Sequence, residues 1–147
     1  MTQLEDAVVV EFPLRGEWMA PNTPGRRVPS HGTDILGQRY AYDLVRLDAS
    51  RRGSPFYHGS VWRYLLIGVR LEDCYGWNQP IYSPVGGVCV QAEDGWPERD
   101  RLHPLLDVAR ALVKGLTVNP KRLTDFRPLA GNHVIIETSD GYVLLAH

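Results

Sequence analysis

The last seventeen residues of the chain, "GNHVIIETSDGYVLLAH", constrain its fold more than any other stretch. Two apolar runs, "NHVIIET" and "YVLLAH", flank the turn sequence "SDG". Apolar, β-branched runs that are separated by a short turn with glycine are typical of a β-hairpin. The second run ends on His147, the last residue of the sequence given. We therefore expect a hairpin with an unpaired edge, because no further strand follows to cover it.

A second region with strand character is "QPIYSPVGGVCVQAEDG". Its residues 81–85 predict one short strand, and Gly86-Gly87 predict a sharp bend. The next strand begins at Val88 and is closed by residues 93–95, the sequence "EDG".

Residues 104–114 have a helical pattern instead. Leu105, Ala109, Leu112 and Leu116 recur on one helical face. Proline at position 104 suits the first helical position, acidic and basic residues match the helix dipole, and Gly115 is expected to end the helix.

The remaining chain offers weaker signals. Residues 6–12 predict a first strand, residues 14–37 a loop, and "QRYAYDLVRL" at 38–47 a strand. The stretch "SVWRYLLIGVRL" fits either a strand or a helix. The architecture that we infer is a mainly β, mostly antiparallel domain with one inserted helix, at about residues 104–114.

Composition excludes several classes of protein. The 147 residues suit a single domain, and a net charge of -1 gives no reason to expect a nucleic acid partner. The longest apolar stretch, "YLLIGV", is too short to span a membrane. The N-terminal sequence lacks the pattern of a secretory signal, which favours the cytoplasm. We expect Cys74 and Cys89 to be free, buried thiols.

Three residues are candidates for chemistry. Asp43 lies within "YAYDLV", where a carboxylate is costly unless it is paired, hydrogen-bonded or metal-bound. His147 closes the last strand, and His31 lies in the loop sequence "PSHGTD". For each residue the alternative is an ordinary surface side chain that faces solvent or makes one hydrogen bond.

The segments "QRYAYDLV", "GWNQPIYSPVGGVCVQAEDG" and "GNHVIIETSDGYVLLAH" together resemble the ordered landmarks of the lysostaphin-like, or LytM-type, zinc metallopeptidase domain. The resemblance covers roughly residues 29–147, apart from the helical insertion. It implies a barrel-like antiparallel sheet of the duplicated hybrid motif type. It also implies a peptidoglycan-hydrolase type of zinc metalloendopeptidase, which acts at the cell envelope.

The resemblance assigns roles to individual residues. Asp43 falls on the zinc-binding aspartate of the family, and His147 falls on a catalytic histidine that stabilises the tetrahedral intermediate. Arg39 stands where the family has its first zinc-binding histidine. His31 is then the expected replacement ligand, and Asp34 is a weaker one.

The family continues beyond the position of His147 to a His-x-His motif, which supplies the third zinc ligand and a second catalytic histidine. This motif is absent from the sequence given. A catalytic zinc ion needs three protein ligands and an open position for water. We therefore expect a single, incomplete domain over residues 1–147, with weak or no activity.

Two alternatives stay open. One is a non-catalytic member of the same fold that acts as a binding or regulatory module, which the replacement by Arg39 favours. The other is a lipoyl- or biotinyl-type carrier, suggested by "SPVGGVCV". Such a carrier needs a modified lysine at the tip of a hairpin, whereas the two lysines of the sequence, Lys114 and Lys121, lie in or near the predicted helix.

The expected partners are a peptide or peptidoglycan substrate, and a second copy that could pair along the exposed sheet edge.

Overall fold

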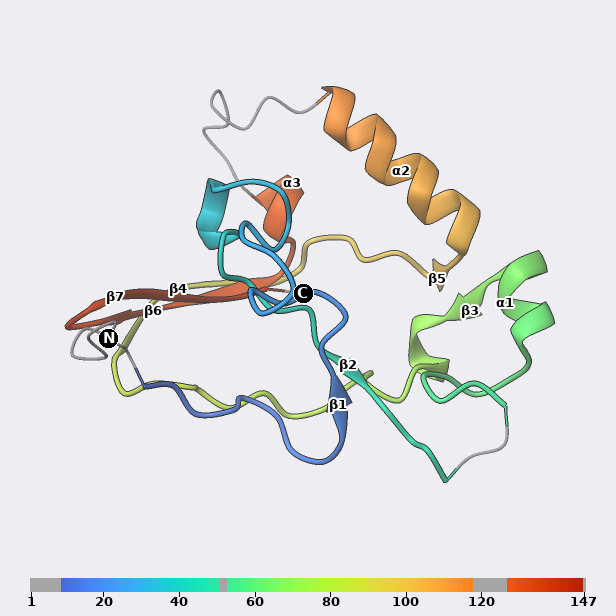
Figure 1. Ribbon diagram of the computed structural model, residues 1–147, viewed down its shortest axis with the longest axis horizontal. Helices are drawn as coiled ribbons and strands as arrows, with labels where there is room; N and C mark the ends of the chain where they lie inside the picture. The colour runs from blue at the N-terminus through green and yellow to red at the C-terminus, as the bar shows by residue number, and fades with distance from the viewer. Residues whose placement is uncertain (1–8, 51–52, 118–126, 147) are drawn as a thin grey trace. The chain divides into compact units, whose positions relative to one another are not determined.

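The computed structural model describes residues 9–50, 53–117 and 127–146 (Figure 1). The chain divides into two compact units. The first unit comprises Met1–Arg15, Pro80–Glu98 and Asp125–His147, and the second comprises Gly16–Gln79 and Arg99–Thr124. The expectation of a single domain stays a prediction.

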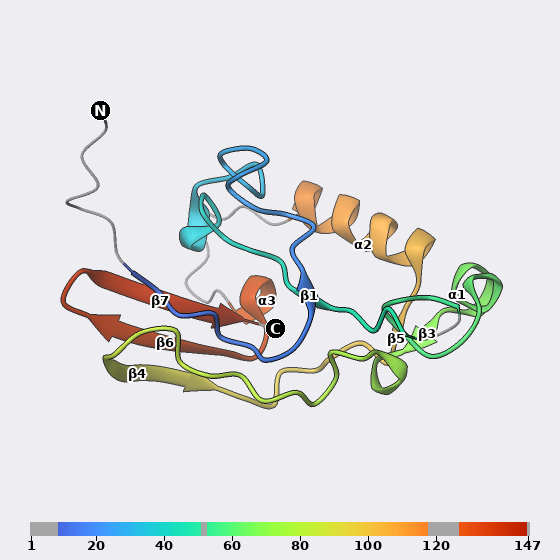
Figure 2. The same ribbon diagram turned by 60° about the horizontal axis from the view of Figure 1, so that its bottom comes forward.

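The first unit contains a three-stranded antiparallel sheet with the order β4-β6-β7 (Figure 2). Its strands are β4 (Val88–Glu93), β6 (His133–Thr138) and β7 (Gly141–Ala146). The β6–β7 register runs from His133 opposite Ala146 to Thr138 opposite Gly141. The predicted hairpin is therefore confirmed over its described residues, as is the strand that begins at Val88.

Apolar burial on this sheet is concentrated on the central strand. Ile136 of β6 is 6% exposed, and Ala130 of the short helix α3 (Arg127–Ala130) is also buried.

Residues 9–15 carry no strand in the structure, so the expected strand at 6–12 is wrong for its described part. This segment instead makes single backbone hydrogen bonds to residues 82 and 84, from Glu11 N to Pro84 O and from Tyr82 N to Pro13 O.

The bend at Gly86-Gly87 brings the chain against β6. A Cβ atom on Gly87 would overlap the carbonyl oxygen of Glu137 and approach Ile136 Cγ2 to 3.0 Å. A Cβ atom on Gly86 would have nothing within 4 Å. Only a residue without a side chain therefore lets the bend contact the backbone of β6 at position 87. The segment before the bend, 81–85, forms no strand, contrary to expectation.

The second unit contains two short antiparallel pairs. Strand β1 (Trp18–Met19) pairs with β2 (Val45–Arg46), and β3 (Val69–Arg70) pairs with β5 (Arg101–Leu102). Two 3-10 turns, η2 (Ile35–Gly37) and η3 (Leu71–Asp73), complete the loops. Of the strand predicted at 38–47, only β2 forms, because the backbone of residues 41–43 bonds to loops instead of to a neighbouring strand.

The ambiguous apolar stretch at 60–71 is divided between a helix and a strand. Helix α1 (Val61–Ile67) begins after Ser60, whose hydroxyl oxygen accepts a hydrogen bond from Arg63 N at 3.2 Å. It ends at Gly68, whose φ of 75° is a left-handed conformation that favours glycine. Val69 of β3 follows and is 1% exposed.

The predicted inserted helix is confirmed as α2 (Pro104–Thr117). Asp107 accepts hydrogen bonds from His103 N at 3.0 Å and from Arg110 at 3.4 Å, which stabilises the first turns. The helix continues through Gly115, so the expected stop at that glycine is wrong. An interior glycine is tolerated in a helix at a cost of about 1 kcal/mol relative to alanine.

The mainly β expectation is confirmed for the described residues, which form three small antiparallel sheets together with the helices. The strands described do not close into a barrel, so the barrel-like part of the expectation is not supported there. No helix of the described part has both the length and the apolar character needed to cross a membrane.

Both cysteines are free thiols, as expected. Cys89 is exposed and Cys74 is half-buried, so the expectation that both are buried is wrong for Cys89. Burial raises the pKa of the Cys74 thiol, and the nearby Asp73 raises it further. The Cys74 side chain is therefore a neutral thiol at neutral pH.

The substitution Gly87→Ala tests the contact of the bend with β6. We expect it to lower the free energy of unfolding by about 1–3 kcal/mol, because the added methyl group must push strand β6 away. The matched control, Gly86→Ala, adds the same group where no atom lies within 4 Å and should change the free energy little. Urea denaturation followed by circular dichroism measures both. Equal effects of the two substitutions would show that the bend does not contact β6 as described.

Candidate functional site

The structure brings two of the predicted site residues, His31 and Asp43, into direct contact in the second unit. Nε2 of His31 lies 3.0 Å from Oδ1 of Asp43, although the residues are 12 positions apart in the chain. The His31 side chain is 22% exposed and the Asp43 side chain 46% exposed. The pair is thus partly shielded from solvent but still reachable by a small ligand.

A buried serine positions the histidine. Ser30 is 2% exposed, and its backbone N–H donates to the carbonyl of Arg39 at 2.9 Å. Its Oγ lies 2.9 Å from the carbonyl oxygen of Gln38 and 2.8 Å from that of Ala41. These contacts join the loop at residue 30 to the segment 38–41. As a result, His31 is held opposite Asp43, which follows that segment in the chain.

The turn around His31 is closed by its own backbone. Gly32 N donates to the carbonyl of Pro29 at 3.1 Å, so residues 29–32 form a β-turn with the histidine at its third position. Gly32 has a φ of 74°, which glycine adopts without the steric cost of a side chain. The sequence "PSHG" therefore places the imidazole on a tight, hydrogen-bonded turn.

A second clamp positions the aspartate. Nδ2 of Asn22 donates to Oδ2 of Asp43 at 2.6 Å, and Asp43 N donates to the carbonyl of Asn22 at 3.1 Å. Two hydrogen bonds between the same two residues fix both the backbone and the carboxylate. Oδ2 is therefore occupied by Asn22, and Oδ1 is directed to His31.

His31 contacts Ser30 through one ring nitrogen and Asp43 through the other. Nδ1 lies 3.0 Å from Ser30 Oγ, and Nε2 lies 3.0 Å from Asp43 Oδ1. The serine hydroxyl has one proton, and three groups can accept it: the carbonyl oxygens of Gln38 and Ala41, and Nδ1 when that nitrogen carries no proton. These contacts fit either tautomer of the neutral ring, with Nδ1–H donating to Ser30 or with Nε2–H donating to Asp43.

The two tautomers offer different chemistry at Nε2. When Nε2 carries the proton, it donates to Oδ1 of Asp43 in an ordinary hydrogen bond. When Nδ1 carries the proton and donates to Ser30, Nε2 keeps a lone pair beside a carboxylate oxygen, and these two atoms can serve together as metal ligands.

The spacing of the two atoms fits zinc. Zinc lies about 2.0–2.1 Å from histidine nitrogen and about 2.0–2.2 Å from carboxylate oxygen, so two ligands of a tetrahedral ion lie roughly 3.3 Å apart. The observed 3.0 Å is close to this separation. The contact from Nδ1 to Ser30 is also the kind of outer hydrogen bond that orients a metal-binding histidine. Within the described residues, no group of three or more His, Cys, Asp or Glu side chains could hold a metal ion.

The other residues predicted from the resemblance lie elsewhere. Asp34, the weaker substitute ligand, forms an ion pair with Arg39 at 2.8 Å instead of joining the His31–Asp43 pair. Arg39 also donates to the hydroxyl of Tyr40 at 3.2 Å, and these two partners raise its pKa. Its guanidinium is a cation without a lone pair for a metal. His147 lies outside the described residues, so its catalytic role and its place opposite Asp43 stay predictions.

Sequence reasoning missed the two residues that orient the pair, Ser30 and Asn22. Ser30 stands beside His31 in "PSHG", and a serine next to a candidate ligand is a signal that could have been noticed. Asn22 lies in the proline-rich loop, 21 positions before Asp43, and no local pattern connects it with the carboxylate.

The substitution Ser30→Ala tests the role of the buried hydroxyl. It removes the only donor hydrogen that Ser30 Oγ directs at two carbonyl oxygens, so we expect a loss of about 1–3 kcal/mol in the free energy of unfolding. The matched control is Ser139→Ala, at an exposed turn where the hydroxyl contacts Asp140. Urea denaturation should show a small effect for the control. If Ser30→Ala were as mild as Ser139→Ala, the hydroxyl would not hold the loop in place.

No protein-family model matches the chain, and comparison with curated proteins and with solved structures found no match either.

Proposed function

We propose that the chain carries the metal-binding part of a zinc metalloendopeptidase-like hydrolase of the peptidoglycan-hydrolase type, with His31 and Asp43 as two zinc ligands. The observation that carries the proposal is the 3.0 Å approach of His31 Nε2 to Asp43 Oδ1, while Nδ1 of the same ring lies 3.0 Å from Ser30 Oγ. The LytM-type resemblance suggested the same two residues from sequence landmarks alone. The geometry and the resemblance are independent reasons for the same assignment.

The same proposal extends to the fold. By the resemblance, the strand after the "SPVGG" bend and the final hairpin are two landmarks of one domain. Here β4 pairs with β6, and Gly87 contacts the backbone of Glu137 at the start of this pairing. This adjacency of two separate sequence landmarks supports the proposed fold type, although the described strands form no closed barrel.

In the proposed site, each described residue has a defined task. His31 offers the lone pair of Nε2, and Ser30 keeps the imidazole in that orientation by accepting from Nδ1. Asp43 offers Oδ1, while Asn22 holds Oδ2 and prevents the carboxylate from turning away. Zinc, when bound, would lower the pKa of a coordinated water towards about 7 and polarise a peptide carbonyl. By the resemblance, His147 would donate a hydrogen bond to the oxygen of the tetrahedral intermediate.

Two protein ligands bind zinc more weakly than the three of a complete catalytic site. We therefore infer weak zinc binding for the sequence given, and weak or no peptidase activity. Cleavage of a cell-wall peptide cross-link is the reaction class that the resemblance implies.

The second candidate function is that of a non-catalytic binding or regulatory module of the same fold. The observation that favours it is the role of Arg39, which replaces the first zinc-binding histidine of the family. Arg39 forms an ion pair with Asp34 and packs its guanidinium at 5.6 Å from the centre of the Tyr40 ring. Such a cluster stabilises the loop without any metal.

Zinc titration separates the two functions. We expect isothermal titration calorimetry to give one zinc ion per chain, with the affinity reduced about tenfold or more in Asp43→Ala, because half of the ligand set is lost. The control is Asp34→Ala, which removes an exposed carboxylate outside the pair and should leave zinc binding unchanged. Nitrogen-15 NMR should show a zinc-dependent shift of His31 Nε2. Absence of zinc binding to the wild-type chain, or equal binding to Asp43→Ala, would favour the non-catalytic module.

The activity itself has a separate test. With equimolar zinc, the 147-residue chain should cleave peptidoglycan or a glycine-rich peptide slowly or not at all, because its zinc ion has two protein ligands in place of three. Mass spectrometry of the peptide products measures the turnover. Robust cleavage would contradict the prediction and would require a third ligand that is not among the described residues.

A further inference from the structure

Helix α2 presents its apolar side to solvent. Leu105, Val108 and Leu112 recur at helical spacing and form one stripe along the helix, which we call the α2 stripe. Their exposed fractions are 73%, 60% and 64%. The amphipathic helices of globular proteins normally bury this side against the core. In α2 the orientation is reversed, and the apolar residues form part of the outer surface.

The polar side of α2 is held by the rest of the second unit. Asp107 lies on the side of the helix away from the stripe, and its side chain is 24% exposed. Its carboxylate accepts a hydrogen bond from His103 N at 3.0 Å and forms an ion pair with Arg99 at 3.1 Å. These contacts oppose rotation of the helix about its axis. The outward direction of the α2 stripe is therefore a property of the fold.

The N-terminal end of α2 is also anchored. Strand β5 ends two residues before the helix and pairs with β3, with Val69 opposite Leu102. Gly68 lies so close to this pair that a Cβ atom there would be 2.6 Å from the carbonyl oxygen of Leu102. Figure 1 shows β3 and β5 beside the lower end of α2. The helix is thus fixed to the second unit at the end where the stripe begins.

The segment that carries the stripe is basic. Residues 99–117 contain four basic and two acidic residues, whereas the whole chain has a net charge of -1. The single carboxylate of Asp107 is shared by two guanidinium groups, those of Arg99 and Arg110, at 3.1 and 3.4 Å. Arg101, which is exposed and lies opposite Arg70 in the β3–β5 pair, adds a further cation. Cations therefore outnumber anions in this segment.

The size and the charge of this surface argue against a second copy of the chain as its occupant. Full burial of a leucine or valine removes roughly 100 Å² of apolar surface from water, so the α2 stripe with Leu106 and Val113 offers less than about 500 Å². A stable protein–protein contact needs about 800 Å² per partner. A symmetric pairing would also bring two equally basic segments together, and like charges repel.

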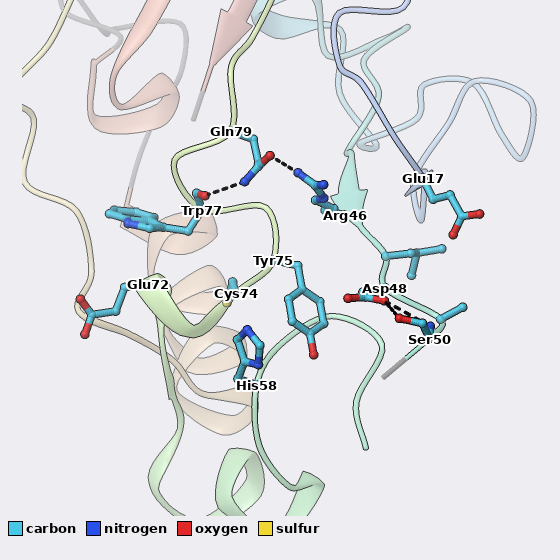
Figure 3. A pocket seen from close by; sticks show the side chains of 12 residues that line it. Glu17, Arg46, Asp48, Ser50, His58, Glu72, Cys74, Tyr75, Trp77 and Gln79 are labelled. Atoms are coloured by element: carbon cyan, nitrogen blue, oxygen red, sulfur yellow. Dashed lines mark hydrogen bonds between the residues drawn. The ribbon is translucent and has the colours of Figure 1, made fainter. Parts of the chain in front are cut away.

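Figure 3 shows a hollow of about 690 Å³ in the same unit, which has an acidic lining instead. The carboxylates of Glu17, Asp48 and Glu72 line it together with one guanidinium, that of Arg46. None of the residues of α2 lines this hollow. An anionic surface is therefore attracted to the segment 99–117 and repelled by the lining of the hollow.

We propose that α2 docks on the surface of an anionic phospholipid bilayer, with the α2 stripe in the outer apolar layer and with Arg101 and Arg110 among the phosphate groups. Helices with apolar side chains on one side and basic residues on the other bind in this way, parallel to the plane of the membrane. The apolar insertion and the attraction between charges act together, and they give weak, reversible binding. The docking involves neither zinc nor the His31–Asp43 pair, so it is independent of the proposed hydrolase function.

Sedimentation with lipid vesicles tests the proposal. The 147-residue chain should bind vesicles made of equal parts of phosphatidylglycerol and phosphatidylcholine, and about tenfold more weakly vesicles of phosphatidylcholine alone. Binding to the mixed vesicles should also weaken as the salt concentration rises, because salt screens the attraction between charges. Equal binding to the two kinds of vesicle, or binding to neither, would overturn the proposal.

Two substitutions with matched controls locate the contact. Leu105→Ser should weaken binding to the mixed vesicles about tenfold, because one leucine no longer enters the apolar layer. Arg101→Gln should weaken it about fivefold, which is the contribution of one basic residue near an anionic surface. The controls are Ile81→Ser, at a 60% exposed residue of the first unit, and Arg26→Gln, at an exposed arginine outside the segment 99–117. Both controls should bind like the wild-type chain.

Circular dichroism checks that each variant is folded. If Leu105→Ser does not fold, the result for Arg101→Gln decides: an unchanged affinity in that folded variant would overturn the proposal. Analytical ultracentrifugation without lipid distinguishes the other occupant. A wild-type dimer that dissociates in Leu105→Ser, together with no binding to vesicles, would show that a second copy covers the α2 stripe and would overturn the proposal.

Discussion

The arrangement of the candidate site depends on one buried hydroxyl group. Ser30 lies almost completely inside the second unit, and its hydroxyl contacts the carbonyl oxygens of Gln38 and Ala41 and Nδ1 of His31. Without this hydroxyl, the two carbonyl oxygens would lose a donor in a region with little access to water, which is costly. The same contact joins the loop to the segment that leads to Asp43. A structural requirement, the pairing of buried polar groups, therefore also determines where the imidazole is placed.

The consequence of this arrangement concerns the second ring nitrogen. Nε2 of His31 faces Asp43, and the proton of the neutral ring lies either on this nitrogen or on Nδ1. A hydrogen bond from Nε2 to the carboxylate and a zinc ion held by both residues are two ways to satisfy this position. They differ in what they imply: the first is a structural link between loops, and the second is the start of a hydrolytic site. Asn22 supports both equally, since it only fixes the orientation of the carboxylate.

The two units differ in how strongly local sequence patterns determine their structure. In the first unit, the alternating runs after Gly87 and Asn132 form the three-stranded sheet, and the close approach of Gly87 to Glu137 fixes where the bend meets the hairpin. In the second unit, strand pairs are two residues long and the loops are held mainly by individual hydrogen bonds. The contact between His31 and Asp43 lies in the second unit, where irregular backbone segments bring distant residues together.

The amino-acid sequence by itself determined the elements that depend on neighbouring residues. The hairpin at 133–146, strand β4 and helix α2 follow from side-chain periodicity and turn residues, which act over a few positions. It also indicated His31 and Asp43 as candidates, through a resemblance in the order of motifs. The apolar run at 60–71 left helix and strand open, and the structure divides it at Gly68 into a helix and a strand. Tertiary structure alone decided that 38–44 is not a strand, and that Ser30 and Asn22 orient the pair. These two outcomes depend on hydrogen bonds between residues far apart in the chain, such as Asn22 and Asp43, and local periodicity contains no information about such contacts.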